Sequence, residues 1–320
     1  MKAIITGVAG FIGSHLADRL LSMGFKVVGI DNFSSGDPNN LSNAINSMSF
    51  KLVKADLINP QSWIEFFNGV DVVFHFAANP EVRHSFREPL DHYRNNVETT
   101  FNVLEACRRF GIRSLVFASS STVYGDPEKI PTPEDHPIKP ISIYGATKAA
   151  CEVLCQTYSK LYGLNSLILR YANIVGPRTN HGVIIDFINK LKLNPYCLEI
   201  LGDGTQTKSY LHIEDALDAS IKAFDKFISD NCPFEVYNVG SMDQITVKDI
   251  ANIIVSNMGL SGVQYVYKPI TFDGRGWPGD VKIMLLDISK LSSKTSWKPK
   301  YSSIEAVERT VKHILNIAYI

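Results

Sequence analysis

The sequence predicts an α/β fold, in which a doubly wound parallel sheet is followed by a smaller C-terminal α/β lobe. Through the first half of the 320 residues, short apolar runs alternate with longer stretches of helical spacing, as in repeated β-α-β units. After about residue 171 this alternation weakens, and prolines and glycines are scattered more widely. We therefore expect residues 1–172 to form the sheet domain, with a return of the chain to it around 208–240, and residues 173–320 to form mainly the second lobe.

Six segments of the first half are candidate strands, because their centres are rich in Val, Ile, Leu and Phe, as in parallel strands buried on both faces. They are Lys2–Thr6, Lys26–Ile30, Ser49–Lys54, Val70–Phe76, Ser114–Ala118 and Ser166–Arg170. Apolar residues at helical spacing predict helices over Phe11–Met23, Asn95–Phe110 and Ile143–Leu161. Residues 202–210 are expected to form a turn and then an extended stretch.

The composition argues against several classes of partner. Lys plus Arg and Asp plus Glu number 32 each, so no bulk charge indicates nucleic acid or an anionic membrane. No uninterrupted apolar run reaches about 18 residues, and the N-terminus enters a strand-like run without signal-peptide character. The five cysteines include no C-x-x-C pair, so we expect buried thiols, without a metal or redox site, in a cytoplasmic protein.

A glycine-rich loop joins the first predicted strand to the first predicted helix. Gly7, Gly10 and Gly13 stand three residues apart in it. In such loops the first glycine permits a tight turn, the second lets the backbone approach a pyrophosphate, and the third lets helix and strand pack closely. The N-terminus of the following helix supplies free N–H groups for phosphate. This context predicts a Rossmann-type nucleotide-binding domain; the alternative is a strand–helix turn without a ligand.

Asp31, at the end of the second predicted strand, indicates which dinucleotide binds. A carboxylate there can accept hydrogen bonds from the ribose hydroxyls and repels a 2′-phosphate. The segment Asn32–Gly36 contains no arginine or lysine to hold that phosphate, so NAD is favoured over NADP. Asp56 and Leu57, just past the third strand, are placed to meet the adenine edge. For Asp56, a loop aspartate that caps a helix is an equally good interpretation.

Tyr144 and Lys148, four residues apart on one predicted helix, share a face and point into the same space. An unperturbed tyrosine has a pKa of about 10, and Lys148 together with a positive nicotinamide ring can lower it enough to make Tyr144 a base. Ser120, in the run Ser119–Ser121, can hold the reacting oxygen by a hydrogen bond. These residues predict removal of a hydroxyl proton while a nicotinamide takes the hydride. The alternative is a surface helix with an exposed Tyr and Lys.

Along nearly its whole length the chain resembles the extended short-chain dehydrogenase/reductase family and, within it, the UDP-glucose 4-epimerase group. The resemblance rests on TGVAGFIGSHL, DNFSSG, HFAA, SSSTVYGD, YGATK, LRYANIVGPR, GDGTQTKSYLHIED, WPGD and MLLDISKL. It implies NAD contacts, besides those above, at Phe11, Ile12, Asn32, Phe33, Ser34, Ser35, Gly36, Phe76, Ala77, Ala78, Asn79, Pro80, Asn95 and Ala172. On the substrate side it implies Asn173, with Lys208, Arg275 and Asp280 around the diphosphate and uridine of a UDP-sugar.

The substrate side departs from the family pattern at two places. Many relatives have arginine where Lys208 stands, so a phosphate contact there would be a point charge and not a fork. The family's last arginine usually stands close before the Gly-Asp pair, whereas Arg275 is separated from Gly279-Asp280 by Gly-Trp-Pro. Four residues after Asp280, the family places a residue that bounds the sugar pocket. Met284 stands there, and its flexibility predicts some acceptance of an N-acetyl sugar.

The residues after Ser120 help to separate sibling reactions. Dehydratases of the family carry an acid pair there, and related decarboxylases carry a glutamate, whereas this chain has Ser121 and Thr122. Neither hydroxyl readily acts as an acid at neutral pH. The resemblance therefore implies NAD-dependent C4 epimerisation of a UDP-hexose, UDP-glucose and UDP-galactose first, through a 4-keto intermediate. A UDP-N-acetylglucosamine or UDP-glucuronate 4-epimerase, a dehydrogenase that releases NADH, another nucleotide-sugar dehydratase and a redox-silent NAD sensor are the alternatives.

The predicted helices Asn95–Phe110 and Ile143–Leu161 carry more apolar side chains than one sheet face needs. Val153, Leu154, Tyr158 and Leu161 belong to this excess. Pairing of both helices across a two-fold axis would form a four-helix interface, so, partly from the family, we expect a homodimer. The alternative is burial within one subunit.

Overall fold

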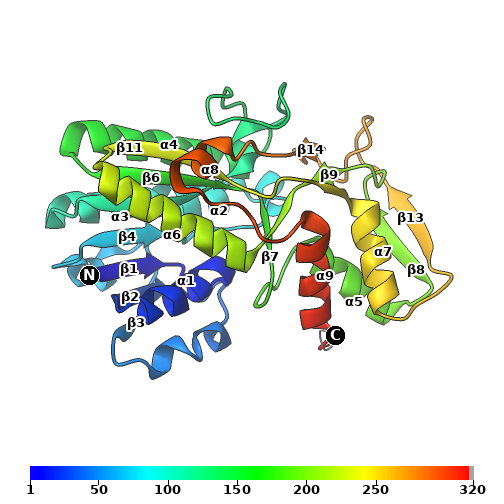
Figure 1. The fold of residues 1–320 in the computed structure, drawn as a ribbon, viewed down its shortest axis with the longest axis horizontal. Helices are drawn as coiled ribbons and strands as arrows, with labels where there is room; N and C mark the ends of the chain where they lie inside the picture. The colour runs from blue at the N-terminus through cyan, green and yellow to red at the C-terminus, as the bar shows by residue number, and fades with distance from the viewer. Residues whose placement is uncertain (317–320) are drawn as a thin grey trace.

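The computed structural model describes residues 1–316 and has a parallel sheet at its centre (Figure 1). The strand order is β11-β6-β5-β4-β1-β2-β3, and all neighbouring pairs run parallel. The bounds are β1 Lys2–Thr6, β2 Lys26–Asp31, β3 Phe50–Lys54, β4 Val72–His75, β5 Ser114–Ser120, β6 Asn165–Tyr171 and β11 Phe234–Val239. The chain leaves β1 for β2 on one side and later returns to β4 on the other, so the carboxyl ends of β1 and β4 form the switch point of the sheet. The predicted α/β fold is confirmed.

Helices cover both faces of this sheet. In the view of Figure 1, α1 (Phe11–Ser22), α6 (Ile213–Asp230) and α8 (Ser289–Thr295) lie in front of it, where α6 contacts both of the others. Behind it lie α3 (Thr99–Phe110) and α4 (Ile143–Tyr162). The predicted helix over 95–110 is divided, because a π-helical segment, η6 (Tyr93–Glu98), precedes α3 and follows the short α2 (Pro89–His92).

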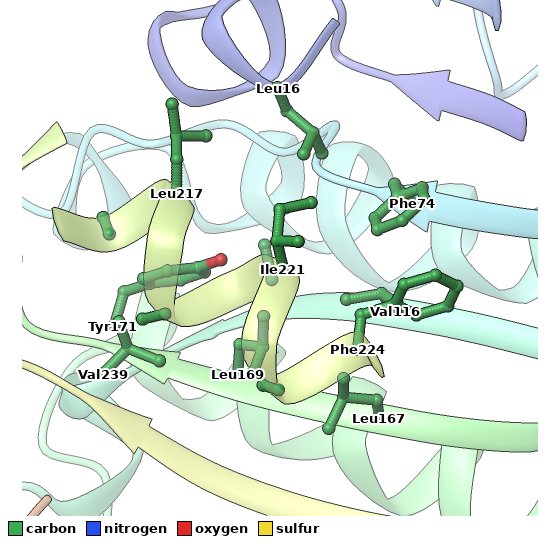
Figure 2. Packing of buried hydrophobic residues seen from close by; sticks show 14 of the residues in the cluster. Leu16, Phe74, Val116, Leu167, Leu169, Tyr171, Leu217, Ile221, Phe224 and Val239 are labelled. Carbon is green, nitrogen blue, oxygen red and sulfur yellow. The ribbon is translucent and has the colours of Figure 1, made fainter. Parts of the chain in front are cut away.

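The helix α6 packs its apolar face on the sheet, as Figure 2 shows. Its side chains Leu217, Ile221 and Phe224 are buried. They meet residues of α1, β4, β5, β6 and β11, namely Leu16, Phe74, Val116, Leu167, Leu169, Tyr171 and Val239. Each large apolar side chain buried in this way contributes roughly 1.5–3 kcal/mol. This packing holds in place the strands whose carboxyl ends carry the site.

The second lobe has small sheets, its own helices and its own apolar core. Two-stranded β8–β13 and β7–β10 are parallel, and β9 joins β12 and β14 in a three-stranded sheet. The strand bounds are β7 Asn173–Val175, β8 Cys197–Leu201, β9 Thr207–Lys208, β10 Tyr210–His212, β12 Ile245–Thr246, β13 Gln264–Lys268 and β14 Ile283–Met284. The helices are α5 Val183–Leu193, α7 Val247–Asn257 and α9 Ser303–Ile314. Within residues 1–316, every helix is too short or too polar to cross a membrane.

Candidate active site

A cleft of about 950 Å³ opens along the carboxyl ends of the sheet strands and continues against the second lobe. It collects nearly all the residues that the sequence singled out. Those that line it are Gly7, Gly10, Phe11, Ile12, Gly13, Asp31, Asn32, Ser34, Ser35, Gly36, Asp56, Leu57, Phe76, Ala77, Ala78, Asn79, Pro80, Asn95, Ser120, Tyr144, Lys148, Ala172, Asn173, Lys208 and Asp280. Phe33, Arg275 and Met284 are not among the lining residues.

The glycine loop has the close packing that its sequence predicts. Gly7 has a φ of +70°, and a Cβ on it would lie 2.7 Å from the amide nitrogen of Ala77. A Cβ on Gly13 would lie 2.1 Å from the carbonyl oxygen of Gly7, so a side chain there would separate α1 from β1. The N-cap of α1 is Gly10, and the first intrahelical bond is the one from Ser14 N to Gly10 O, 3.0 Å long. The N–H groups of the first turn thus remain for an anion in the cleft.

The Asp31 side chain faces the cleft and also binds the backbone of the glycine-rich loop. Its carboxylate accepts hydrogen bonds from Ala9 N (2.9 Å) and Phe33 N (2.8 Å). Burial raises its pKa, against which these amide hydrogen bonds act. An ionised carboxylate offers about four lone-pair sites, so two further hydroxyl groups can bind it. Asp56 lines the cleft, and its Oδ1 accepts from Ile58 N at 2.9 Å in a local turn. It does not cap a helix, because the N-cap of the next one, η3 (Pro60–Ser62), is Asn59.

Ser120, Tyr144 and Lys148 meet where β5 faces the start of α4. Ser142 caps α4 by accepting a hydrogen bond from Gly145 N (3.1 Å), which places Tyr144 and Lys148 in the first two turns of the helix. Ser120 lies near enough to the Tyr144 hydroxyl to act on its pKa, and Thr122 donates to the Ser120 oxygen from its backbone N (3.2 Å) and its hydroxyl (3.0 Å). Ser120 and Tyr144 both line the cleft, so the two side chains meet at its wall.

Burial dominates the pKa values of Tyr144 and Lys148. Burial raises the pKa of Tyr144 to about 12, and the hydrogen bond from Ser120 offsets only part of that effect. Burial lowers the pKa of Lys148 to about 8. Its Nζ donates to Ala118 O (2.8 Å) and lies 5.9 Å from the centre of the Tyr144 ring. Loss of hydration therefore dominates both pKa values in the protein alone, and the joint lowering of the Tyr144 pKa by Lys148 and a nicotinamide ring stays a prediction.

A buried ion pair fixes this end of β5, and the sequence reasoning missed it. Glu152, one turn after Lys148 on α4, binds Arg170 of β6 with an Nη2–Oε2 distance of 2.7 Å. Both side chains are at most 5% exposed. Ser119 donates a hydrogen bond to the same carboxylate. Because Ser119 precedes Ser120, the pair orients the strand end that carries the serine. The spacing of four residues between Lys148 and Glu152 was the signal available in the sequence.

Two strand pairs bring the predicted substrate residues to the cleft. Lys208 on β9 binds Asp280 with an Nζ–Oδ1 distance of 2.7 Å, and Asn173 on β7 donates to Ser209 O (3.1 Å). Trp277 lies between two cations: Lys208 Nζ is 5.5 Å and the Arg83 guanidinium 5.6 Å from its ring centre. Arg83 and Trp277 both line the cleft and were missed, because only the fold brings them together.

The three residues outside the lining have other surroundings. Met284 is 5% exposed and packs in the main apolar cluster, with its backbone paired to Lys208. Its side chain lies in the protein interior and not among the lining residues, so the expected role of Met284 at the sugar pocket stays a prediction. The ring of Phe33 packs on the same cluster, with Lys54 Nζ 5.8 Å from its centre. Arg275 is held by the carboxylates of Asp126 and Asp273.

The cleft fits a dinucleotide with a neighbouring sugar nucleotide. The glycines leave no room for side chains, the first turn of α1 offers N–H groups, and Asp31 offers acceptors for hydroxyls. Lys208 and Arg83 supply positive charge at the other end. The arrangement can bind an oxidising cofactor beside a hydroxyl-bearing substrate and move one proton between that substrate and Tyr144.

Comparisons with known proteins agree with this geometry. Residues 3–240 match the model of the NAD dependent epimerase/dehydratase family. A putative UDP-glucose 4-epimerase of Methanocaldococcus jannaschii is 35% identical over 98% of both chains. A crystal structure of a UDP-galactose 4-epimerase is 47% identical and covers 100% of both chains, with a TM-score of 0.89. A UDP-glucuronic acid 4-epimerase from Bacillus cereus, in complex with UDP-glucuronic acid and NAD, is 32% identical over 99% of this chain and 100% of that one, with a TM-score of 0.89.

The family match covers most of the chain, and the relatives align over nearly their whole length. The chain therefore belongs to the NAD dependent epimerase/dehydratase family, within the extended short-chain dehydrogenases/reductases and their NAD-dependent nucleotide-sugar 4-epimerases, and its cofactor is NAD.

Proposed function

We propose that the protein interconverts UDP-glucose and UDP-galactose by inverting C4 of the hexose, a step of galactose metabolism. The observation that carries this proposal is the convergence of the Tyr144 and Ser120 hydroxyls at the cleft wall. Ser121 and Thr122 stand where dehydratases of the family have acids, which favours oxidation followed by reduction over elimination. We assign residues 1–172, with the return at 208–240, to NAD binding and most of 173–320 to the UDP-sugar.

Bound NAD supplies a reversible hydride acceptor and a positive ring beside Tyr144. Tyr144 takes the proton of the 4-hydroxyl while C4 loses a hydride, and Ser120 holds the oxygen that becomes the ketone. The 4-keto sugar turns about its bond to the diphosphate, and Tyr144 returns the proton when hydride re-enters on the opposite face. Lowering the Tyr144 pKa from about 12 to neutrality needs roughly 7 kcal/mol. The site must therefore be closed to water and positively charged when Tyr144 takes the proton. Lys148 holds the ribose and adds its charge.

Replacing one oxygen atom tests this mechanism. Tyr144→Phe should lose orders of magnitude in turnover and keep its NAD, because the phenolic oxygen transfers the proton and the ring still packs. Tyr162→Phe is the matched control, since Tyr162 lies on the same helix with 53% of its surface exposed. Turnover by Tyr144→Phe within a few-fold of wild type would refute the mechanism.

A second substrate, UDP-glucuronate, is favoured by Arg83. The guanidinium lines the cleft and can fork a carboxylate as well as a phosphate. We therefore offer UDP-glucose, UDP-galactose and their N-acetyl and uronate counterparts to wild type and to Arg83→Ala, and identify the products by NMR. A uniform rise in KM in the variant assigns Arg83 to the diphosphate. A loss confined to the uronates assigns it to the sugar carboxylate and makes UDP-glucuronate the substrate.

The same assay separates the other candidate functions. NAD that is retained through purification and the absence of net NADH favour the epimerase. Exchangeable NAD with NADH release indicates a dehydrogenase, and no turnover with any sugar indicates a redox-silent NAD sensor. All five cysteines are free thiols, which fits the reducing cytoplasm in which we propose that the enzyme acts.

We also propose that the enzyme is a homodimer that pairs α3 and α4 with a second copy. Phe101, Val153 and Leu161 are 46%, 57% and 67% exposed on these helices. Leu154 is half-buried, and Tyr158 is buried within the subunit, where its hydroxyl donates to Glu105 (2.6 Å). Light scattering at micromolar concentration should give a dimer, and Leu161→Glu should dissociate it; a wild-type monomer would contradict the proposal.

A further inference from the structure

The loop of residues 271–280, between β13 and β14, is called the strap. It crosses toward the loop of residues 121–142, between β5 and α4, which is called the catalytic loop. The strap is folded on itself, because Gly274 N donates to Thr271 O (3.1 Å) and Asp280 N donates to Trp277 O (3.2 Å). Three of its residues, Trp277, Gly279 and Asp280, line the cleft. The position of the strap therefore decides the shape of the cleft next to Lys208.

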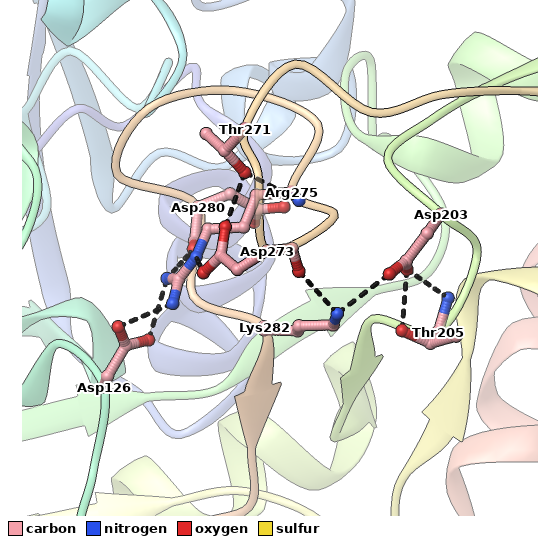
Figure 3. A network of polar contacts seen from close by, with 8 residues as sticks. All are labelled: Asp126, Asp203, Thr205, Thr271, Asp273, Arg275, Asp280 and Lys282. Atoms are coloured by element: carbon pink, nitrogen blue, oxygen red, sulfur yellow. Dashed lines mark hydrogen bonds and ion pairs between the residues drawn. The ribbon is translucent and has the colours of Figure 1, made fainter.

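One end of the strap is fastened to the second lobe. Lys282 donates from Nζ to Asp203 Oδ2 (2.8 Å) and to the backbone oxygen of Asp273 (2.7 Å). Asp203 N donates to Gly274 O at 2.9 Å. Figure 3 shows the two bonds of Lys282. These bonds hold the strap to its own lobe, whatever happens at the catalytic loop.

The other end reaches the catalytic loop through Arg275. Its two Nη atoms bind both carboxylate oxygens of Asp126, at 2.9 and 2.8 Å (Figure 3). Asp126 follows Ser120 by six residues, on the loop that leaves β5. Arg275 Nη1 also donates to Asp280 O (2.6 Å), and the Asp280 carboxylate holds Lys208. A continuous series of contacts thus runs from the loop after Ser120 to the lysine at the substrate end.

These contacts leave Arg275 little capacity for a phosphate. A guanidinium has five N–H donors. Nε binds Asp273 (2.6 Å), and the Nη atoms make the two bonds to Asp126 and the one to Asp280 O. Four donors are therefore engaged, and two carboxylates already balance the charge.

We infer that Arg275 is a positioning residue, whose ion pair with Asp126 fastens the strap across the cleft and thereby places Lys208 and Trp277 against the diphosphate. The inference rests on the proposed UDP-sugar substrate. Asp126 is 48% and Arg275 17% exposed, so the pair is screened by water and can open at small cost when substrate enters or leaves. A direct phosphate ligand would need the guanidinium free of Asp126.

Quenching of Trp277 fluorescence by acrylamide measures how far the strap is exposed to solvent. Of the three tryptophans, Trp63 and Trp297 are at most 1% exposed, so the quenchable emission reports Trp277. We compare holoenzyme variants Asp126→Asn, Arg275→Gln and the double substitution, and measure quenching without ligand and the Kd for UDP. Glu128→Gln is the matched control, because it removes from the same loop a carboxylate whose one ion pair within residues 1–316 is with Lys139 of that loop, at 2.9 Å.

The inference predicts that each single variant raises both the quenching and the Kd for UDP, by about fivefold in Kd. The double variant should equal either single one, and Glu128→Gln should behave like wild type. The inference would be overturned if Arg275→Gln raised the Kd for UDP far more than Asp126→Asn and the two effects added in the double variant. Arg275 would then be a direct phosphate ligand. Asp126→Asn without effect on either measurement would also overturn the inference. Failure of wild type to bind UDP would instead refute the proposed substrate, and the quenching would still decide the role of the pair.

Discussion

Lys148→Met should make the protein more stable at neutral pH while it abolishes turnover. Lys148 is 3% exposed, and burial lowers its pKa from 10.5 to about 8. Each pKa unit corresponds to about 1.4 kcal/mol, so the charged form costs the folded state about 3 kcal/mol at neutral pH. Methionine fills a similar volume without that charge. Loss of the hydrogen bond to Ala118 O offsets about 1–2 kcal/mol, which leaves a net gain of roughly 1–2 kcal/mol.

The pH dependence distinguishes this effect from improved packing. The folded pKa is lowered, so the cost is fully present below about pH 8, and it disappears as the pH rises toward 10.5, where the unfolded chain also loses the proton. Urea unfolding of wild type and Lys148→Met, both freed of NAD, gives the two free energies at each pH. Their difference should shrink by about 3 kcal/mol across that window. A difference that stays constant with pH would show that Lys148 is not buried as a charge, and the reasoning would be wrong.

The remaining predictions concern the scaffold of the site. Glu152→Gln should cost about 3–5 kcal/mol in urea unfolding, because it leaves Arg170 as a buried charge with an incomplete partner; a cost below about 1 kcal/mol would contradict the buried pair. Gly13→Ala should abolish NAD retention after gel filtration, since its Cβ would meet Gly7 O at 2.1 Å; normal retention would show that the loop can shift without loss. Met284→Tyr should lower the free energy of unfolding by about 1–3 kcal/mol through overpacking and affect all sugars alike, and a selective loss on N-acetyl sugars would show that Met284 is a gate.

The sequence was a sufficient guide to the cofactor half because its chemistry is local. The turn at Gly7, the close approach at Gly13 and the acceptor at Asp31 each depend on a few neighbouring residues and on the β-α-β order. Tyr144 and Lys148 meet because they are four apart on one helix. The strands β1, β2, β4, β5 and β6 follow from apolar runs that are typical of strands buried on both faces, whereas β3 carries the exposed Lys51 and Lys54.

The weakest predictions lie in the second lobe, whose strands of two or three residues leave no periodic pattern. The short strands β9 and β14 pair across 75 or more positions, and their register places Met284 beside Lys208 in the interior. A count of four residues from Asp280 could not show that, because the side to which a strand residue points depends on its partner strand.

The sequence by itself determined the α/β class and the dinucleotide loop, and it singled out the candidate residues of proton transfer, because these follow from short motifs and from the β-α-β order. Only the tertiary structure decided what surrounds them. The Arg275–Asp126 contact spans 149 positions, and Glu152–Arg170 joins a helix to a strand. The energy of a charged group depends on which partners and how much water the fold leaves it, and the sequence alone does not show that carboxylates surround Arg275.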